Sequence, residues 1–371
     1  MFPNCCQILG KVFVTLAYFD MAKLIYVGEL KNEPDRDSGW IREFSNLGWE
    51  SIPFSTQKPK SSSLWGRVCY RLKTGKDYKL LRADLLELVA KEMPDWVHFR
   101  LPVEFDRKTI CAIKSFGVIV TEYCNDDPFS VTAPFGTYSK FKRAIAAYDM
   151  HFVFREHNLV SFYGAGARYA EHCPPYYDES VHKTSVRPGV VEFVADAAFV
   201  GHWEDDGRLG YLEALVRSGY SVALRGSYWD RPIRKTALEE MGPVRGAFFD
   251  EYNFIYANAM VGICFFSKIN RDAWTRRPLE IVAVGGLLVC ERTEEALAQF
   301  KDKEEAFFFS SVSELLESVK VLKSNPELRR RVRDAGYRRL KLNGDTLRSR
   351  ACQIDGRVKE MLERSHTDKS Y

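Results

Sequence analysis

The chain has 371 residues, a length that suggests two domains. Its 54 Lys and Arg residues nearly balance its 50 Asp and Glu residues, and the net charge of +4 argues against a dedicated polyanion-binding protein. With 46% hydrophobic and 28% charged residues, the composition excludes a disordered or fibrous chain.

The cysteines and histidines give no indication of a metal site. No two cysteines form a C-x-x-C pair, so zinc-ribbon and thioredoxin-like sites are not expected. Thiols in apolar runs, such as Cys264 and Cys290, behave as small hydrophobic groups and fit a reducing cytoplasm. The histidines lack metal-ligand spacing. We therefore expect a cytoplasmic protein without a bound metal.

Residues 1–20 are expected to be an N-terminal extension. Their apolar part, residues 5–19, is interrupted by Lys11 and is too short to span a membrane. It also lacks the basic start and the small-residue cleavage site of a signal peptide. No other stretch reaches eighteen apolar residues, so we expect at most peripheral membrane contact.

From Met21 onward, short apolar strands alternate with amphipathic helices, a pattern that predicts a doubly wound parallel sheet. This first domain is expected to cover residues 21–180. Its predicted strands are 23–28, 50–54, 96–99, 117–123 and 151–154. Its predicted helices are one from Ser38 to a stop at Gly48, followed by 77–92, 105–114 and 139–147.

A proline-containing stretch without periodicity, residues 171–189, is predicted to link this domain to a second one at 190–343. The predicted strands there are 197–200, 220–224, 247–249, 261–266, 287–290 and 306–309. The predicted helices are 208–217, 251–259, 278–284, 293–300, 312–323 and 326–341. A last helix at 346–363, within the segment 344–371, is expected to pack back on the first domain. Two such domains imply a cleft, where ligands bind beyond the carboxyl ends of the strands.

The segment at residues 267–294 carries the strongest indication of a ligand site. It follows the apolar run VGICFF (261–266), so its polar residues lie at the carboxyl end of a strand. Arg276 and Arg277 stand at the predicted start of the next helix, where guanidinium groups suit an anion such as a pyrophosphate. In the first helical turn, Glu280 can accept two hydrogen bonds from a vicinal diol such as a nucleotide ribose.

Two glycines complete this unit. Gly285 and Gly286 are predicted to end the helix and to allow close backbone approach before the next strand. For each residue alone a structural role is an alternative, since Glu280 could complement the helix dipole and the arginines could be solvated. Their combination in one strand–loop–helix–strand unit favours an anionic ligand.

The motif N-R-D-x-x-T-R-R-x-x-E-I-x-A-x-G-G-x-L-x-x-E-R-T (270–293) resembles the donor-binding segment of group-1 glycosyltransferases. It is most similar to the spore-maturation-protein (CgeB-like) branch. FVGHW (199–203), DEYNFIYANAMVGICFF (250–266), the tail ending in NPELRRRVRDAGYRR (314–339) and the turn at 125–128 agree with this resemblance. The similarity extends over about residues 22–350 and is sharp in the second domain.

The resemblance implies an α/β protein of the GT-B fold: two Rossmann-like parallel-sheet domains facing a cleft, with C-terminal helices. The second domain would hold the donor. In this family one carboxylate of an E-x7-E pair binds the ribose, which implies this role for Glu280. The other contacts the donor sugar and falls on Asp272, a residue one methylene shorter. Further donor-binding residues implied here are Arg276, Arg277, Arg225, Gly201, Thr275, Asn270, Gly285 and Gly286.

An inverting enzyme of this kind needs a base on the acceptor side. The candidates are Asp126 and Asp127, which follow a predicted strand, and His98 at the end of another. For either aspartate a plain Asx-Pro turn is an equal alternative. For His98 a core or rim position is the more probable one. A retaining enzyme would need no separate base, so both stereochemical outcomes stay open.

Two further patterns are assigned structural roles. GAGARY (164–169) resembles a dinucleotide fingerprint, but Tyr169 replaces its third glycine and the segment follows a helix, so no NAD site is expected. The basic run at 329–341 is expected to be a solvated helix face; contact with anionic lipid or nucleic acid is the alternative.

The resemblance implies transfer of a sugar from a nucleotide-diphosphate-sugar donor, a UDP- or GDP-sugar, to a hydroxyl acceptor. A glycan or a lipid-linked polysaccharide precursor would serve as acceptor. No cofactor or metal is implied, because positive side chains and helix dipoles replace the metal in this family. Two alternatives stay open: a non-catalytic nucleotide-sugar-binding protein, and a sugar transferase acting on modified nucleic acid. The nearly balanced charge argues against stable nucleic-acid binding.

Overall fold

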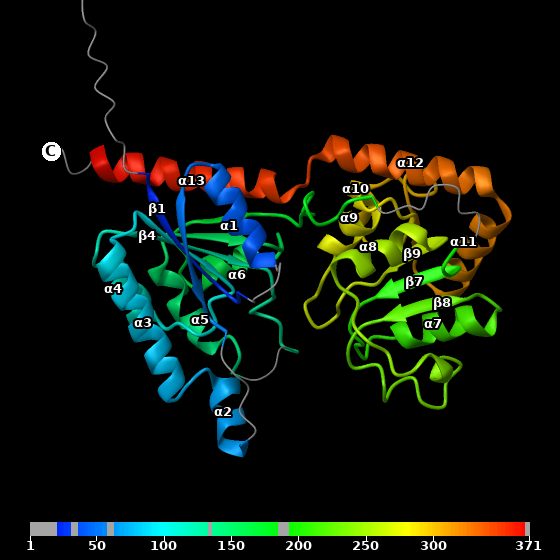
Figure 1. Cartoon of the computed structure of the whole chain (residues 1–371), viewed down its shortest axis with the longest axis horizontal. Helices are drawn as coiled ribbons and strands as arrows, with labels where there is room; N and C mark the ends of the chain where they lie inside the picture. Colours follow the sequence, from blue (N-terminus) through cyan, green and yellow to red (C-terminus); the bar gives the residue numbers. More distant parts are fainter. Residues whose placement is uncertain (1–20, 31–35, 58–62, 133–135, 185–192, 368–371) are drawn as a thin grey trace, which may run out of the picture.

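The computed structural model describes residues 21–30, 36–57, 63–132, 136–184 and 193–367. The expected extension at residues 1–20 lies outside these ranges. Figure 1 shows two lobes side by side, each with a sheet at its centre and helices around it. The strand pairs in both sheets are parallel, which confirms the two Rossmann-like domains expected from the alternation of strands and helices.

The first domain is built on a six-stranded sheet with the order β2-β1-β3-β4-β5-β6. Its central strands are buried along most of their length because both faces of the sheet are covered, and they include the buried polar residues His98, Thr121 and Glu122. The strands are β1 (Lys23–Gly28), β2 (Glu50–Ser55), β3 (Trp96–Arg100), β4 (Ile119–Cys124), β5 (Met150–Val153) and β6 (Ala170–His172). The helices are α1 (Arg36–Asn46), α2 (Leu64–Leu72), α3 (Lys76–Glu92), α4 (Arg107–Lys114), α5 (Ser139–Ala144) and α6 (Asn158–Gly164), with a 3-10 turn at Ile145–Ala147.

The second domain has a five-stranded sheet with the order β11-β10-β9-β7-β8. Its strands are β7 (Ala197–Val200), β8 (Val222–Arg225), β9 (Val261–Cys264), β10 (Leu288–Glu291) and β11 (Phe307–Phe309). Its helices are α7 (Arg208–Arg217), α8 (Phe249–Asn258), α9 (Arg276–Ala283), α10 (Glu294–Gln299), α11 (Val312–Ser324) and α12 (Pro326–Asn343), with a 3-10 turn at Glu239–Met241. One face of this sheet packs with α8 and α9, and the other packs with α7 and α11.

The last helix, α13 (Leu347–Thr367), returns to the first domain and lies along it in Figure 1. Its buried residues Leu347, Ala351, Ile354 and Val358 join the aromatic cluster around Trp40 of α1. The indole of Trp49 also donates a hydrogen bond to Asp355 at 2.7 Å. The first domain therefore completes its core with residues from the far end of the chain.

The chain crosses between the domains twice, and the two crossings are bonded to each other. The amide of Tyr177 donates to the carbonyl oxygen of Asp345 at 3.0 Å, and the amide of Leu347 donates to that of Tyr177 at 2.8 Å. The predicted linker at 171–189 is thus partly structured: it begins inside β6, and Tyr176 and Tyr177 are buried. The sequence pattern did not predict the ordered part of this segment, because its contacts are made with residues far away in the chain.

Three elements differ from the predictions. The strand predicted at 247–249 is wrong: α8 begins at Phe249, whose φ of 48° turns the backbone out of an extended conformation. Helix α2 and strand β6 were not predicted. Strand β6 has only three residues, too few for a recognisable pattern. No helix in the described ranges is long and apolar enough to cross a membrane.

Candidate functional site

A pocket of about 620 Å³ opens between the two domains, where the carboxyl ends of several strands meet. Glu29 and Arg100 line it from the ends of β1 and β3 in the first domain. Gly201 and Gly226 line it just after β7 and β8 in the second. The start of α9 supplies its charged wall, Arg276, Arg277 and Glu280. This is the position expected for a ligand in a parallel α/β sheet.

Glu280 is held at this wall by three side chains. The hydroxyl of Tyr252 donates a hydrogen bond to its Oε2 at 2.8 Å, and its Oε1 lies 3.2 Å from Nε of Arg276 and 3.6 Å from Nε2 of His182. The pKa of His182 is lowered, mainly because the ring is buried. The charge of Glu280 raises this pKa, and the charge of Arg276 lowers it further. The carboxylate, 7% exposed, is therefore fixed in orientation at the edge of the pocket.

The two adjacent arginines have different surroundings. Arg276 is engaged: it donates to the carbonyl oxygen of Tyr176 at 3.1 Å, stacks on that ring at 4.2 Å and pairs with Glu280. Arg277 makes no hydrogen bond or ion pair with the residues that the structure describes, and its Nε is buried without a partner. Its guanidinium lies over the ring of Phe199 at 5.6 Å. Arg277 is therefore a cation that an anionic ligand could pair with.

Gly201 brings the backbone close to this cation. A Cβ atom at Gly201 would stand 2.8 Å from Nη1 of Arg277 and 2.8 Å from the ring of Phe199. Across the same edge, Gly226 has a φ of +144°, and a Cβ there would lie 1.8 Å from the carbonyl oxygen of Gly201. That oxygen also accepts a hydrogen bond from the indole of Trp229 at 2.8 Å. A side chain at Gly226 would therefore collide with the backbone, and a side chain at Gly201 would have to displace Arg277.

Several residues expected at the donor site lie outside this pocket's lining. Arg225 donates to its neighbouring carbonyl at 2.9 Å and lies 3.6 Å from Glu251. Thr275 is the N-cap residue of α9, without a side-chain capping bond. The amide of Asn270 donates to Ser267 Oγ at 3.2 Å. The donor contacts expected for these three residues are therefore not formed by the lining of this pocket.

The two glycines after α9 are structural. Gly285, with a φ of +91°, ends the helix. A Cβ atom at Gly286 would meet the carbonyl oxygens of Tyr256 and Ile281 at 2.8 and 2.9 Å. Both glycines are buried away from the pocket, so the expected donor contact is replaced by close packing between α8 and α9.

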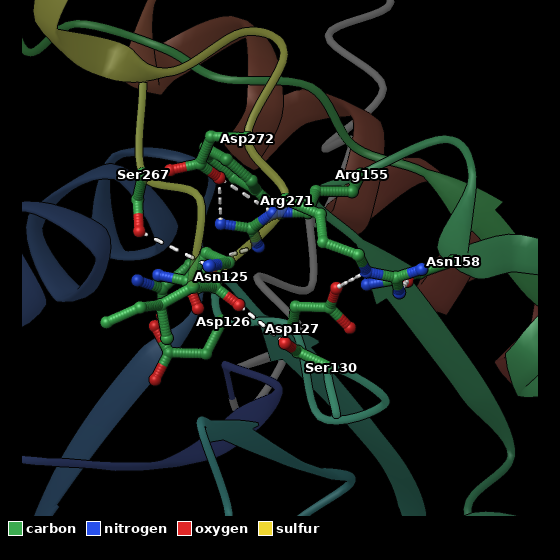
Figure 2. A network of polar contacts seen from close by, with 12 residues as sticks. Asn125, Asp126, Asp127, Ser130, Arg155, Asn158, Ser267, Arg271 and Asp272 are labelled. Carbon is green, nitrogen blue, oxygen red and sulfur yellow. Dashed lines mark hydrogen bonds and ion pairs between the residues drawn. The ribbon is translucent and has the colours of Figure 1, made fainter. Parts of the chain in front are cut away.

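Asp272 joins the two domains. Nε of Arg155 donates to its Oδ1 at 2.8 Å, and a second nitrogen of the same guanidinium contacts that oxygen. Burial raises the pKa of Asp272, and the charge of Arg155 opposes this rise. Figure 2 shows both residues within one polar network of the two domains. The sugar contact implied for Asp272 therefore competes with an interdomain ion pair.

The expected bases lie in or near the same network. Asp127 is fully buried and pairs with Arg271 of the second domain at 2.6 Å (Figure 2). Burial alone would raise the pKa of Asp127, but the hydrogen bonds from Arg271 and from the amide of Phe129 lower it below its usual value. A carboxylate held in this way is a poor base. Asp126 accepts a hydrogen bond from Tyr138 at 2.8 Å and stays a candidate.

His98 does not fit the role of a base. Its side chain is 1% exposed, among the rings of Trp40, Phe44 and Trp96, and its Nδ1 lies 2.8 Å from Oγ1 of Thr121. Burial and the charge of Arg100 lower the pKa of His98 to about 3. It lies inside the aromatic core rather than at the pocket, so the expectation of a catalytic role is corrected.

Sequence reasoning missed three important partners. Tyr252, which orients Glu280, lies in the segment 250–266 that carried the resemblance, but its spacing from Glu280 gave no indication of contact. His182 comes from the segment predicted as a linker, and Arg155 follows β5. His202, which follows Gly201 in the sequence, also lines the pocket. No group of three or more metal-ligating side chains is found in the described ranges.

Comparisons with known proteins agree with this geometry. Residues 208–356 match the model of a family described as "Glycosyl transferase-like". No curated protein matches the sequence. Sucrose-phosphate synthase from Thermosynechococcus elongatus has a TM-score of 0.64 at 10% identity, covering 92% of this chain and 100% of that one.

Two further solved structures have the same arrangement. A glycosyltransferase from Rickettsia africae has a TM-score of 0.64 at 13% identity, covering 93% of this chain and 99% of that one. HepE from Anabaena, in complex with UDP-glucose, has a TM-score of 0.62 at 11% identity, covering 91% of this chain and 99% of that one. Together with the two parallel sheets, these likenesses show that the chain has the GT-B fold.

Proposed function

We propose that the chain is a glycosyltransferase that moves a sugar from a nucleotide-diphosphate-sugar donor to a hydroxyl acceptor. The observation that carries this proposal is Arg277, a guanidinium without a carboxylate partner among the described residues, placed beside Gly201 at the N-terminus of α9. The match of residues 208–356 to a glycosyl transferase-like family and the UDP-glucose bound by the Anabaena relative support it.

The chemistry follows from this charge distribution. When the bond from the anomeric carbon to the diphosphate breaks, negative charge grows on the leaving phosphate. Arg277 and the free amides of the α9 N-terminus would stabilise this charge. Glu280, oriented by Tyr252, would accept hydrogen bonds from the ribose diol. These groups do the work that a metal ion does elsewhere, so we propose metal-independent transfer.

Finer assignments rest on the motif and on the first domain. We propose a donor of the UDP or GDP class and an acceptor that is a glycan or lipid-linked precursor of a surface polysaccharide, used in the cytoplasm. We also propose that the chain belongs to the spore-maturation branch, on the basis of the motif at 270–293 and the segments that agree with it. Asp126 is the proposed base if the reaction inverts the anomeric centre.

Calorimetric titration with UDP and GDP tests the site. Arg277→Met should weaken binding of the preferred diphosphate by about 10- to 100-fold, because one charge-assisted hydrogen bond is lost. Glu280→Gln should weaken it by about tenfold. Arg217→Met, which removes a solvent-exposed guanidinium from α7 of the same domain, is the matched control and should bind normally. Unchanged binding by the first two variants would contradict the site.

One observation favours a second candidate function, a nucleotide-sugar-binding protein without turnover. Asp272, which would contact the donor sugar, is paired with Arg155. Slow hydrolysis of UDP-, GDP- and TDP-sugars distinguishes the two. Hydrolysis that Arg277→Met abolishes supports a transferase, whereas tight binding without hydrolysis or transfer supports the binding protein.

A further inference from the structure

Helix α2 exposes an apolar stripe. Trp65, Val68 and Leu72 are spaced by three and four residues, so they lie on one side of the helix. Their exposed fractions are 74%, 40% and 40%. In Figure 1, α2 projects from the lower edge of the first domain. Helices of globular proteins normally bury such a stripe, so its exposure marks a contact surface.

The helix is well defined locally. The hydroxyl of Ser63 accepts a hydrogen bond from the amide of Gly66 at 2.9 Å, which caps the N-terminus. Lys73, with a φ of 50°, closes the other end. The stripe is therefore displayed by a stably terminated helix, and its apolar face is a lasting feature of the surface.

A basic pocket lies at the C-terminal end of this helix. It has a volume of about 680 Å³, and α4 and α5 line it with Arg107, Lys108, Lys140 and Arg143. Its acidic lining residue, Asp106, is already engaged as the N-cap of α4, accepting hydrogen bonds from the amide and the hydroxyl of Thr109 at 3.0 and 2.9 Å. Four cationic side chains thus line the pocket together with one carboxylate, which is already hydrogen-bonded to Thr109.

Two contacts join the pocket to the stripe. Nζ of Lys140 donates to the carbonyl oxygen of Lys73, the residue that caps α2. A Cβ atom on Gly136 would lie 3.1 Å from Cδ2 of Leu72. Arg67 of α2, Lys76 of α3 and the acidic Asp77 are also exposed on these two helices. Apolar and cationic groups therefore share one corner of the first domain.

The basic helix α12 provides a comparison. Arg333 pairs there with Asp334, Arg339 with Glu305 and Lys341 with Glu179. Its exposed Arg330 and Arg331 form no ion pair with a described residue. No ion pair is made by Arg107 or Lys108 with any residue in the described ranges. Both places therefore present unpaired cations, but those of the basic pocket are the ones that the contact between Lys140 and Lys73 joins to the apolar stripe.

We propose that α2 and the basic pocket form a docking face for a bilayer that contains anionic phospholipids. An indole prefers the boundary between headgroups and acyl chains, and the neighbouring aliphatic side chains extend the buried area. Lysines and arginines at the same corner bind lipid phosphates. An apolar protein partner would need no such cluster of cations. The proposal is independent of the donor site, which lies in the pocket between the two domains and shares none of these residues.

Flotation of the full-length protein with vesicles tests this face. Vesicles of phosphatidylcholine that contain phosphatidylglycerol should bind the protein at low salt, so that it floats with them. Vesicles of pure phosphatidylcholine should not bind it. Arg107→Glu with Lys108→Glu should lower the partition coefficient by at least about 25-fold, since each basic residue near the surface contributes about fivefold. Glutamates suit the first turn of α4, so this variant should fold. Trp65→Ser with Leu72→Ser should lower it on the order of tenfold or more.

Two matched variants serve as controls. Arg330→Glu with Arg331→Glu makes the same charge change on exposed positions of α12, and Val160→Ser removes an apolar side chain, 79% exposed, from α6. Both should bind vesicles as the unmodified protein does. Failure to bind anionic vesicles, equal binding to neutral ones, or an equal loss in the α12 variant would overturn the proposal. Nucleotide binding by the α2 and α4 variants should be unchanged, which separates this test from that of the donor site.

Discussion

Arg155 of the first domain and Asp272 of the second form an ion pair between the domains, with Nε and Oδ1 2.8 Å apart. In the adjacent ion pair the charges are exchanged, because Arg271 of the second domain binds Asp127 of the first. One loop between β9 and α9 therefore exchanges charges of both signs with the first domain. The same loop leads into α9, so the donor pocket is connected directly to the packing between the domains.

Removing the carboxylate of this pair should destabilise the protein. In Asp272→Ala the guanidinium of Arg155, whose side chain is 5% exposed, would stay buried without its partner. We expect a loss of about 3 kcal/mol in the free energy of unfolding, measured by denaturant titration. Glu213→Ala, which breaks the exposed pair with Arg217, should change the free energy of unfolding far less. If the changes in the free energy of unfolding caused by Arg155→Ala and Asp272→Ala add up in the double variant, the two residues do not interact.

A methyl group at Gly201 should weaken diphosphate binding. Its Cβ would stand 2.8 Å from the Arg277 guanidinium, which must shift away from the pocket. We expect Gly201→Ala to lower the affinity for the nucleoside diphosphate by about tenfold, the effect of losing one hydrogen bond to a charged group. Gly210→Ala in α7 is the matched control, because its Cβ would meet nothing within 4 Å. Equal affinities of the two variants would show that Gly201 is not at the binding site.

The hydroxyl of Tyr252 should matter through Glu280. Tyr252→Phe removes the 2.8 Å hydrogen bond that orients the carboxylate but leaves the ring packed on Tyr256. Nucleotide affinity should fall by about five- to tenfold, with nearly unchanged thermal stability. Tyr211→Phe, which removes a hydroxyl from the surface of α7, should have no effect on binding. A nucleoside lacking the ribose diol should bind the wild type and Tyr252→Phe equally.

His98 should influence acid stability rather than activity. Its pKa in the folded state, about 3, lies below the usual 6.5, so the unfolded chain takes up the proton first. The contribution of the neutral His98 imidazole to the free energy of unfolding is complete above about pH 6.5. It is lost as the pH falls toward 3, at about 1.4 kcal/mol per pH unit. His98→Phe should therefore show a smaller fall in melting temperature between about pH 7.5 and about pH 5 than the wild type.

The same variant tests the catalytic alternative for His98. Transferase or hydrolase activity should persist in His98→Phe, because the imidazole is enclosed by aromatic rings. His157→Gln, which changes a side chain that is 38% exposed, should also keep its activity. Complete loss of activity in a folded His98→Phe protein would restore the role of a base.

Local signals predicted the charged wall of the pocket well. The apolar strand before it, the two arginines and the proline that begin α9, and the paired glycines after it all lie within one short segment. Strand ends and helix starts are set by such neighbours, so Arg276, Arg277 and Glu280 could be placed at the cleft from sequence. The position of Gly201 could be predicted in the same way, because this residue follows the apolar strand β7.

Side-chain partners could not be predicted, because they depend on how the two domains meet. Arg155 and Asp272 are 117 positions apart, and no periodic pattern relates them. Arg276 was expected to face a phosphate, yet Tyr176 from the crossing segment engages it. The strand predicted at 247–249 failed for a related reason: a short apolar run before a helix is compatible with a loop whose Ala247 is buried against α8.

The return of α13 has a consequence for synthesis of the chain. Leu24 of β1 leaves the ribosome first, but the cluster to which it belongs is completed by Ile354 and Val358. Translation of the whole second domain separates these partners. The core of the lobe that emerges first therefore cannot be completed until the second domain and α13 have been translated.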